Sequence, residues 1–346
     1  MRLPAFLVIT AAVATAATVG VGAQSRQTIR PAIPAYDDGA VEVLPLQGSL
    51  FLIAGTGANV TVQNSDEGFL LIDSSSAEAA PKILEALRTI APDKPIRLII
   101  STSTDEARTS GNAILSESGR NIWAGVGGGA GREPSRLEGA PIIAHENALL
   151  RMSGLSGEPE RLPYGVRPHD TFFGEKKSFF YGGEPVEIIH QPAAHSDSDL
   201  MVWFRKSDVV AAGSLYSTVE YPRIELARGG SVQGTLDALN DILDIAVPQY
   251  NNQGGTLIVP GRGRISNESD VAEYRDMVTI IVDRVRAMVD EGLTLAQVKA
   301  RRPSLDYDGI YGNPGSDWTA DMFLEAVYTD LVAKRTPPAP AGRRGR

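Results

Sequence analysis

The sequence predicts an α/β fold built as a single domain over residues 41–335. Three observations lead to this prediction. Strand and helix patterns alternate along the chain in two similar halves. No linker and no change of composition separates the two halves. Apolar residues make up 42% of the 346 residues, which is enough for one sizeable core.

The first half is expected to begin with a meandering sheet. Its short β-rich runs, separated by Gly, Asn and Asp turns, span residues 48–53, 59–63 and 69–72. Apolar residues from Ile83 to Ile90 then recur at helical spacing until Pro92 ends the helix, and Ser74-Ser75-Ser76 precede it as candidate caps. Residues 98–101 are expected to form a buried strand.

The second half repeats this order of elements. Strands are expected near residues 184–189, 199–204, 208–213 and 256–259, with a helix over about 232–246. The strongest helix has apolar residues three or four apart, namely Val271, Tyr274, Val278, Ile281, Val285 and Met288. Gly292 is placed for a left-handed cap, and Thr294 with Gln297 predicts a capping box that starts another helix.

Residues 1–23 are predicted to be a signal peptide. Arg2 precedes an apolar stretch that is short for a membrane span, and Val21-Gly22-Ala23 forms a small-residue cleavage pattern before Gln24. The mature protein is therefore expected to be periplasmic or secreted, with no stable membrane span. Residues 24–40 are expected to be extended, because prolines and an Asp-Asp-Gly turn prevent regular structure.

Composition and charge exclude several classes of function. The chain has no cysteine, so it has no disulfide, no Cys-type zinc site and no thiol nucleophile. Its net charge of −9 repels phosphate backbones and anionic lipid, so a nucleic-acid partner is not expected. Residues 336–346 are basic and rich in Pro and Gly, and a disordered tail is predicted there.

Ordered landmarks give the chain a family resemblance over most of residues 41–335. They are Asn59-Val60-Thr61-Val62, Leu70-Leu71-Ile72-Asp73, Gly111-Asn112, the run from His190 to His195, Ala212-Gly213-Ser214-Leu215 and Val259-Pro260-Gly261-Arg262-Gly263. With them the chain resembles an exported member of the metallo-β-lactamase superfamily. The resemblance implies an αββα sandwich, in which two mixed β-sheets are flanked by helices.

The resemblance also implies where zinc ligands would lie. In the family, a Thr-His-x-His-x-Asp-His loop converges on two zinc ions. Alignment on Thr102 and Gly111-Asn112 gives the equivalent positions as Ser103, Asp105, Ala107 and Arg108. Later in the chain the family His is kept as His195, the bridging Asp is replaced by Ser214, and the last His is replaced by Arg262. Zinc needs three or four N, O or S donors, so no metal and no other cofactor is expected.

The leading functional hypothesis is a non-catalytic or zinc-independent paralogue that binds an anionic small molecule or a protein partner. Arg108 and Arg262 would act as carboxylate clamps near Asp105 and His195. The two arginines and Asp105 sum to about the charge of the intact two-zinc site. In the structural alternative, both arginines pair with Asp105 and neighbouring acids and simply fill the old site.

Two catalytic alternatives remain open. The first is a metallo-hydrolase of ester, lactam or thioester bonds, with one metal held by Asp105, His195 and either Glu106 or Asp197. The second is a metal-free hydrolase in which Ser103 or Ser214 is activated by His195 and oriented by an aspartate. Ser103, Asp105, His195 and Ser214 are therefore weak catalytic candidates, since no nucleophile elbow is visible.

Several other polar residues are expected to have structural roles. His145, at the start of a helix, His169 and His190 are interpreted as hydrogen-bonding residues. Asp73 is expected to organise the loop that holds Ser103. Two loops carry Ser75 and Ser196 where the family favours Gly, so a shift of these loops is expected. Residues 125–131 form a glycine-rich run without the features of a phosphate loop and are expected to be a flexible loop.

Overall fold

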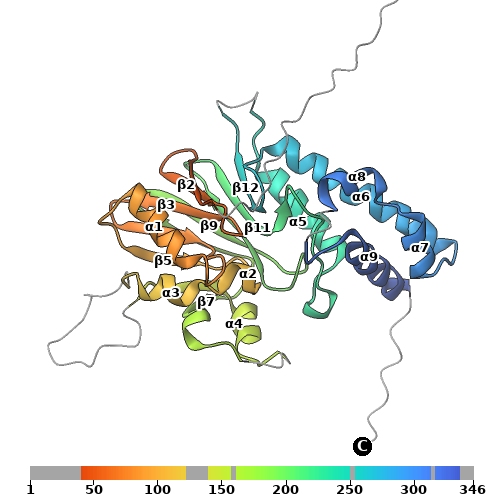
Figure 1. Cartoon of the computed structure of the whole chain (residues 1–346), viewed down its shortest axis with the longest axis horizontal. Coiled ribbons are helices and arrows are strands. Elements are labelled where there is room, and N and C mark those ends of the chain that lie inside the picture. The colour runs from red at the N-terminus through yellow and green to blue at the C-terminus, as the bar shows by residue number, and fades with distance from the viewer. Residues whose placement is uncertain (1–39, 122–138, 157–160, 250–253, 313–315, 336–346) are drawn as a thin grey trace, which may run out of the picture. The chain divides into compact units, whose positions relative to one another are not determined.

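Two β-sheets pack face to face in the centre of the molecule, and helices cover their outer faces (Figure 1). The structure, a computed structural model, describes residues 40–121, 139–156, 161–249, 254–312 and 316–335. The predicted signal peptide, the extended segment before residue 40, the glycine-rich run and the C-terminal tail lie outside the described residues. These four expectations therefore stay predictions.

The first sheet has seven strands in the order of the chain, from β1 to β7. They are β1 (Glu42–Pro45), β2 (Leu50–Ala54), β3 (Val60–Ser65), β4 (Gly68–Ile72), β5 (Ile96–Ile100), β6 (Ile142–His145) and β7 (Asp170–Phe172). The first four strands are antiparallel neighbours, and β4 to β7 run parallel. Crossovers between the parallel strands leave their carboxyl ends, and the loops that follow them, at one edge.

The second sheet has five strands in the order β12-β11-β10-β9-β8. They are β8 (Lys176–Tyr181), β9 (Glu184–Gln191), β10 (Asp199–Phe204), β11 (Val209–Ser217) and β12 (Leu257–Arg262). Only β11 and β12 pair in parallel, so this sheet is mixed as well.

The described helices follow the strands in both halves. They are α1 (Ala80–Ile90), α2 (Glu106–Thr109), α3 (Asn112–Glu117), α4 (Glu146–Met152), α5 (Val232–Ile245), α6 (Glu268–Asp290), α7 (Leu295–Arg301), α8 (Leu305–Tyr311) and α9 (Ala320–Arg335), with 3-10 turns at Tyr164–Val166 and Leu226–Arg228. No helix in the described part of the chain has both the length and the apolar character that a membrane crossing requires.

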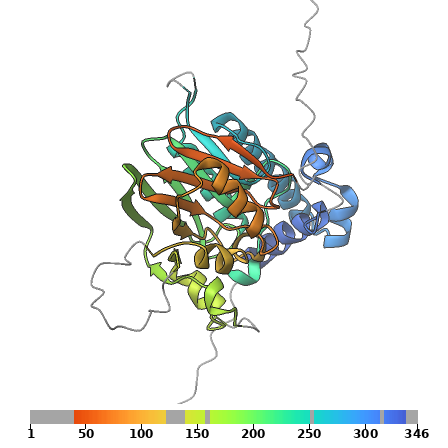
Figure 2. The same cartoon turned by 60° about the vertical axis from the view of Figure 1, so that its left-hand side comes forward.

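Three apolar clusters define four layers. The central cluster lies between the sheets and combines Leu70, Ile100, Val202 and their neighbours from both sheets. A second cluster packs α1 and Leu115 of α3 against the first sheet. The third packs α5, α6 and α9 against the second sheet. Figure 2 shows α1 on the outer face of the first sheet, with the C-terminal helices on the opposite side. The αββα sandwich expected from the sequence is thus confirmed.

Most of the expected elements are present within a few residues. The capping box of Thr294 and Gln297 begins α7, and Gly292 has the positive φ of a left-handed cap. The expected serine cap of α1 is wrong, because the helix has Ala79 as its N-cap and no side-chain cap bond. Of the three serines, only Ser76 bonds to the start of this helix, where its hydroxyl accepts a hydrogen bond from the Ala79 amide. The sequence patterns also missed β1, β6, β7 and β8, which are short or have polar exposed positions.

Candidate functional site

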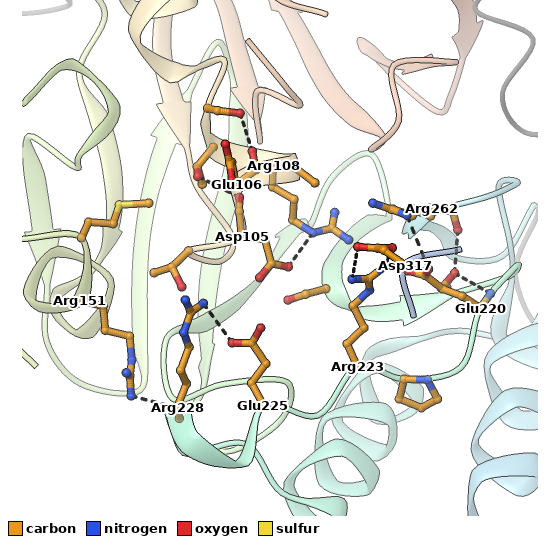
Figure 3. A pocket seen from close by; sticks show the side chains of 18 of the residues that line it. Asp105, Glu106, Arg108, Arg151, Glu220, Arg223, Glu225, Arg228, Arg262 and Asp317 are labelled. Atoms are coloured by element: carbon orange, nitrogen blue, oxygen red, sulfur yellow. Dashed lines mark hydrogen bonds and ion pairs between the residues drawn. The ribbon is translucent and has the colours of Figure 1, made fainter. Parts of the chain in front are cut away.

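A pocket of about 700 Å³ lies where loops from both sheets meet. Its walls come from the loop after β5, the end of β11 with the segment after it, and the end of β12. Figure 3 shows that charged side chains from these segments point toward one another. The arginines that line the pocket are Arg108, Arg151, Arg223, Arg228 and Arg262, and the carboxylates are Asp105, Glu106, Glu220, Glu225 and Asp317.

The structure brings the site residues predicted from the sequence together. Asp105, Arg108, Ser214 and Arg262 all line the pocket. His195 contacts Asp105 from behind the pocket wall, with Nε2 at 2.9 Å from Oδ1 of Asp105. The roles of these residues in binding or catalysis stay predictions.

Asp73 organises the loop after β5, as expected. One of its carboxylate oxygens accepts the amide of Thr102 and the other accepts the Thr102 hydroxyl, both at 2.7 Å. Burial raises the pKa of Asp73, although Arg108 acts in the opposite direction. Ser75 has a φ of 55°, so it takes the left-handed conformation despite its side chain, and its hydroxyl donates to the Thr56 carbonyl.

Asp105 and His195 form an ion pair in which His195 is buried and Asp105 is half-buried. Burial opposes the protonated form of His195, but the carboxylate of Asp105 and the hydrogen bond to it outweigh burial and raise the pKa of His195 to about 10. Burial would likewise raise the pKa of Asp105, yet the charge of His195 holds that pKa well below its usual range. The Nδ1 atom of His195 lies 3.0 Å from the Arg223 carbonyl, which fixes the ring. At neutral pH the site therefore contains an imidazolium.

Arg108 is enclosed by the residues that it contacts. Its side chain is only 7% exposed and lies 3.7 Å from a carboxylate oxygen of Asp73 and 3.7 Å from one of Asp105. It also donates to the Gly261 carbonyl at 3.3 Å. A Cβ atom at Gly261 would lie 2.1 Å from the Arg108 guanidinium. The absence of a side chain at Gly261 therefore leaves room for the guanidinium. Arg108 thus matches the structural alternative, in which an arginine fills the site.

Arg262 has a different environment. Its guanidinium pairs with Glu220 at 3.6 Å, and its side chain is 24% exposed. Its partner is thus a neighbouring acid, as the structural alternative allows, while Asp105 pairs with His195 and Arg108. Arg262 therefore remains at the pocket surface.

The two candidate serines are not hydrogen-bonded to His195. Ser214 donates to Asp199 at 2.7 Å, and Ser103 accepts from the Asp105 amide at 3.2 Å while being fully buried. Burial raises the pKa of Asp199 to about 6, although His195 opposes this shift. The ring nitrogens of His195 contact Asp105 and a backbone carbonyl instead. A Ser-His-Asp relay is therefore not assembled in this conformation.

Neither of the expected additional metal ligands belongs to the group that could hold an ion. Asp197 accepts two hydrogen bonds from Arg151, each at 2.7 Å. Glu106 lines the pocket from an exposed position on α2. The described group of possible ligands is instead Asp105, His195 and Glu225, whose donor atoms lie within 4.8 Å of one another.

This group fits zinc poorly. Glu225 is paired with Arg228 at 3.0 Å, and Asp105 faces Arg108. A metal at the Nε2 atom of His195 would have to displace a proton that is held with a pKa of about 10. The guanidinium groups around the three ligands would repel the cation. We therefore assign no catalytic step to zinc.

The remaining histidines lie outside the pocket lining. His145 caps α4 by accepting from the Asn147 amide, and its ring stacks on that of His190 at 3.6 Å. Burial lowers the pKa of His145 to about 4 and also lowers the pKa values of His169 and His190. These three rings are therefore neutral at neutral pH.

The sequence interpretation missed the charged segment after β11. Glu220, Arg223, Glu225 and Arg228 all belong to it and line the pocket, and Asp317 reaches the pocket from the segment before α9. The alternation of acids and arginines over residues 220–228, directly after a family landmark strand, was the available signal. The sequence contains no comparable signal for Asp317, because its position at the pocket depends on how the C-terminal helices pack.

His195 is expected to be the only charged histidine of the four near pH 8. Histidine-selective ¹⁵N NMR should show one imidazolium and three neutral rings. His195→Gln should remove the imidazolium signal, whereas His190→Gln should remove a neutral one. Because the folded-state pKa is raised, the stability contributed by this protonation is present below about pH 6.5 and is lost as the pH rises toward 10. Four neutral rings would contradict the ion pair.

Known proteins resemble the chain in sequence and in fold. No known family profile matches it. A metallo-β-lactamase type 2 of Bacillus sp. (strain 170) is 20% identical over 264 residues, which cover 74% of this chain and 89% of the relative. Among solved structures, a metallo-β-lactamase from Pontibacter korlensis aligns with a TM-score of 0.51 at 14% identity, covering 69% of this chain and 99% of the other.

The inverting sec-alkylsulfatase Pisa1 from Pseudomonas sp. also has this fold. It aligns with a TM-score of 0.59 at 16% identity and covers 87% of this chain. The chain spans about half of the sulfatase, 52% of its length. Together with the αββα architecture, these similarities show that the chain has the metallo-β-lactamase fold.

Proposed function

We propose that the pocket binds a small organic anion without zinc and that the protein is not a zinc-dependent hydrolase. The observation that carries this proposal is the set of charges at the base of the pocket. A buried arginine lies against Asp73 and Asp105, and an imidazolium lies behind Asp105. These positive groups already compensate both carboxylates and would repel a metal cation. The guanidinium groups that line the rest of the pocket are suited to pair with an anion.

The shape and lining of the pocket support a small-molecule ligand rather than a large partner. A volume of about 700 Å³ is in the usual range for ligand pockets. Apolar side chains also line it, among them Met152, Leu162, Val166 and Tyr221. A ligand with an anionic group and an apolar body would match both features. The net charge of −9 argues against nucleic acid as a partner.

A single-metal hydrolase is the second candidate. The similarity to metallo-β-lactamases and to a sec-alkylsulfatase favours it, as does the group of Asp105, His195 and Glu225. The arginine partners of these carboxylates argue against it. Metal content separates the two proposals directly.

The purified mature protein is expected to contain far less than one zinc per chain after dialysis. Elemental analysis of protein refolded with added zinc provides the measurement. A matched variant, Arg108→His, adds one imidazole and removes one guanidinium, so it should retain more zinc than the wild type. Stoichiometric zinc in the dialysed wild type would contradict the proposal.

Sulfate or a carboxylate is expected to raise the melting temperature by roughly 3 °C at about ten times its Kd. Arg262→Ala should remove this shift, because its guanidinium lies at the pocket surface. Arg284→Ala is the control, since Arg284 pairs with Asp306 on the helical side of the molecule, outside the pocket lining. If no anion produces a shift, the arginines only fill the site and the binding proposal is wrong.

We further propose that the protein acts outside the cytoplasm, as residues 1–23 suggest. In a Gram-negative host, periplasmic protein should begin at Gln24 by mass spectrometry. Ala23→Asp should block this processing, while Ala17→Ser should not. Protein that stays in the cytoplasm with residues 1–23 attached would refute export.

A further inference from the structure

Among the carboxylates that line the pocket, Asp317 is distinguished by its exposure and by the segment that carries it. Asp317 belongs to the segment before α9 and is 71% exposed at its side chain. Both of its oxygens are held by Arg223, with Oδ2 accepting from Nη1 at 3.0 Å and Oδ1 accepting from Nη2 at 2.5 Å. This paired geometry is the one in which arginine recognises a free carboxylate.

Arg223 is itself firmly positioned. Its carbonyl contacts the ring of His195, its Nη2 also reaches Glu220 at 3.3 Å, and its guanidinium lies over the Trp318 ring, 5.9 Å from the centroid. The Trp318 indole donates to the Pro222 carbonyl at 3.1 Å. The segment that carries Asp317 is therefore attached beside Arg223 through Trp318, independently of the Asp317 carboxylate.

Of the two acids that pair with Arg223, Asp317 is the one that a ligand carboxylate would replace more easily. Glu220, the other acid on Arg223, is only 9% exposed at its side chain and is shared with Arg262. An exposed ion pair contributes little, because water screens it and its side chain is free to rotate. A carboxylate that enters the pocket with an apolar body gains contacts that Asp317 lacks. The side chain of Asp317 is able to rotate into solvent while Trp318 stays in place.

The charges of the residues that line the pocket also favour the replacement of Asp317 by a ligand carboxylate. Five arginines and five carboxylates line the pocket, so its lining is neutral while Asp317 is included. When Asp317 leaves Arg223, the lining around the guanidinium has one positive charge in excess. The pocket then matches a ligand with a single negative charge.

We propose that Arg223 is the carboxylate-binding residue of the pocket and that Asp317 occupies this subsite as a tethered competitor until a monoanionic organic carboxylate displaces it. This inference rests on the proposed anion-binding function and adds the ligand class and the residue that recognises it. Arg262, which shares Glu220 with Arg223, borders the same subsite and contributes its charge to anion binding there.

The test uses benzoate as the probe and benzamide as its uncharged counterpart, with Kd measured by titration calorimetry on the full-length mature protein. Wild type should bind benzoate and not benzamide. Asp317→Asn keeps the shape but removes the competing charge, so benzoate should bind about three to ten times more tightly. Asp306→Asn, at the exposed Arg284 pair, is the matched control and should leave the Kd unchanged. Arg223→Gln should weaken binding at least about tenfold.

The outcomes separate the inference from the function on which it rests. If wild type binds benzoate but Asp317→Asn binds it no more tightly, Asp317 has a structural role only and the inference is wrong, while anion binding stands. If neither protein binds benzoate or sulfate, both are wrong. Because Arg223→Gln could disturb the fold, Arg223→Lys provides a second variant that keeps the charge and loses the paired geometry. Equal benzoate affinity of folded Arg223→Lys and wild type would also overturn the inference.

Discussion

The contact between Asp105 and the buried His195 imidazolium joins the two sheets of the sandwich at the pocket. Asp105 follows β5 of the first sheet, and His195 follows β9 of the second. Removing Asp105 would leave the buried imidazolium of His195 without its hydrogen-bonded partner, which is far more costly than losing an exposed pair. Arg108 extends the contact to Asp73, so the base of the pocket is a continuous chain of alternating charges. The arrangement of the pocket walls depends on this chain.

Toward the pocket opening, the arginines are paired with acids in the same way. Arg151 is paired with Asp197, Arg228 with Glu225, and Arg262 with Glu220. Such pairing limits the net field in the cavity and keeps cationic side chains from attracting anions indiscriminately. Selectivity then depends on which pair is exposed enough to exchange partners, rather than on the number of positive charges.

Much of the fold follows from local patterns in the sequence. The apolar spacing in α6 and the capping box of α7 come from residues close together in the chain, and the structure has both. The cap of α1 did not follow, because Ser74 and Ser75 bond to the Arg108 and Thr56 carbonyls instead of to the helix. Long-range hydrogen bonds of these two serines thus take the place of the local capping bonds.

The candidate site was only partly predictable for the same reason. Ordered landmarks selected Asp105, Arg108, His195, Ser214 and Arg262 as candidates. In the structure four of them line one pocket, and His195 contacts Asp105. The partner of each residue was not predictable, since Glu220 and Asp199 reach the site through the geometry of β10 and β11. Asp317 is more than 90 residues from Arg223 in the chain, and only the packing of α9 brings the two together.

The immobilisation of Arg108 has a consequence for ligand association. Its carbonyl accepts from both the amide and the hydroxyl of Ser74, while its guanidinium holds the Gly261 carbonyl. Arg108 thereby connects the ends of β4 and β12 before any ligand binds. A cavity whose floor is already ordered loses little conformational entropy when it is filled, so more of the contact energy is retained as affinity.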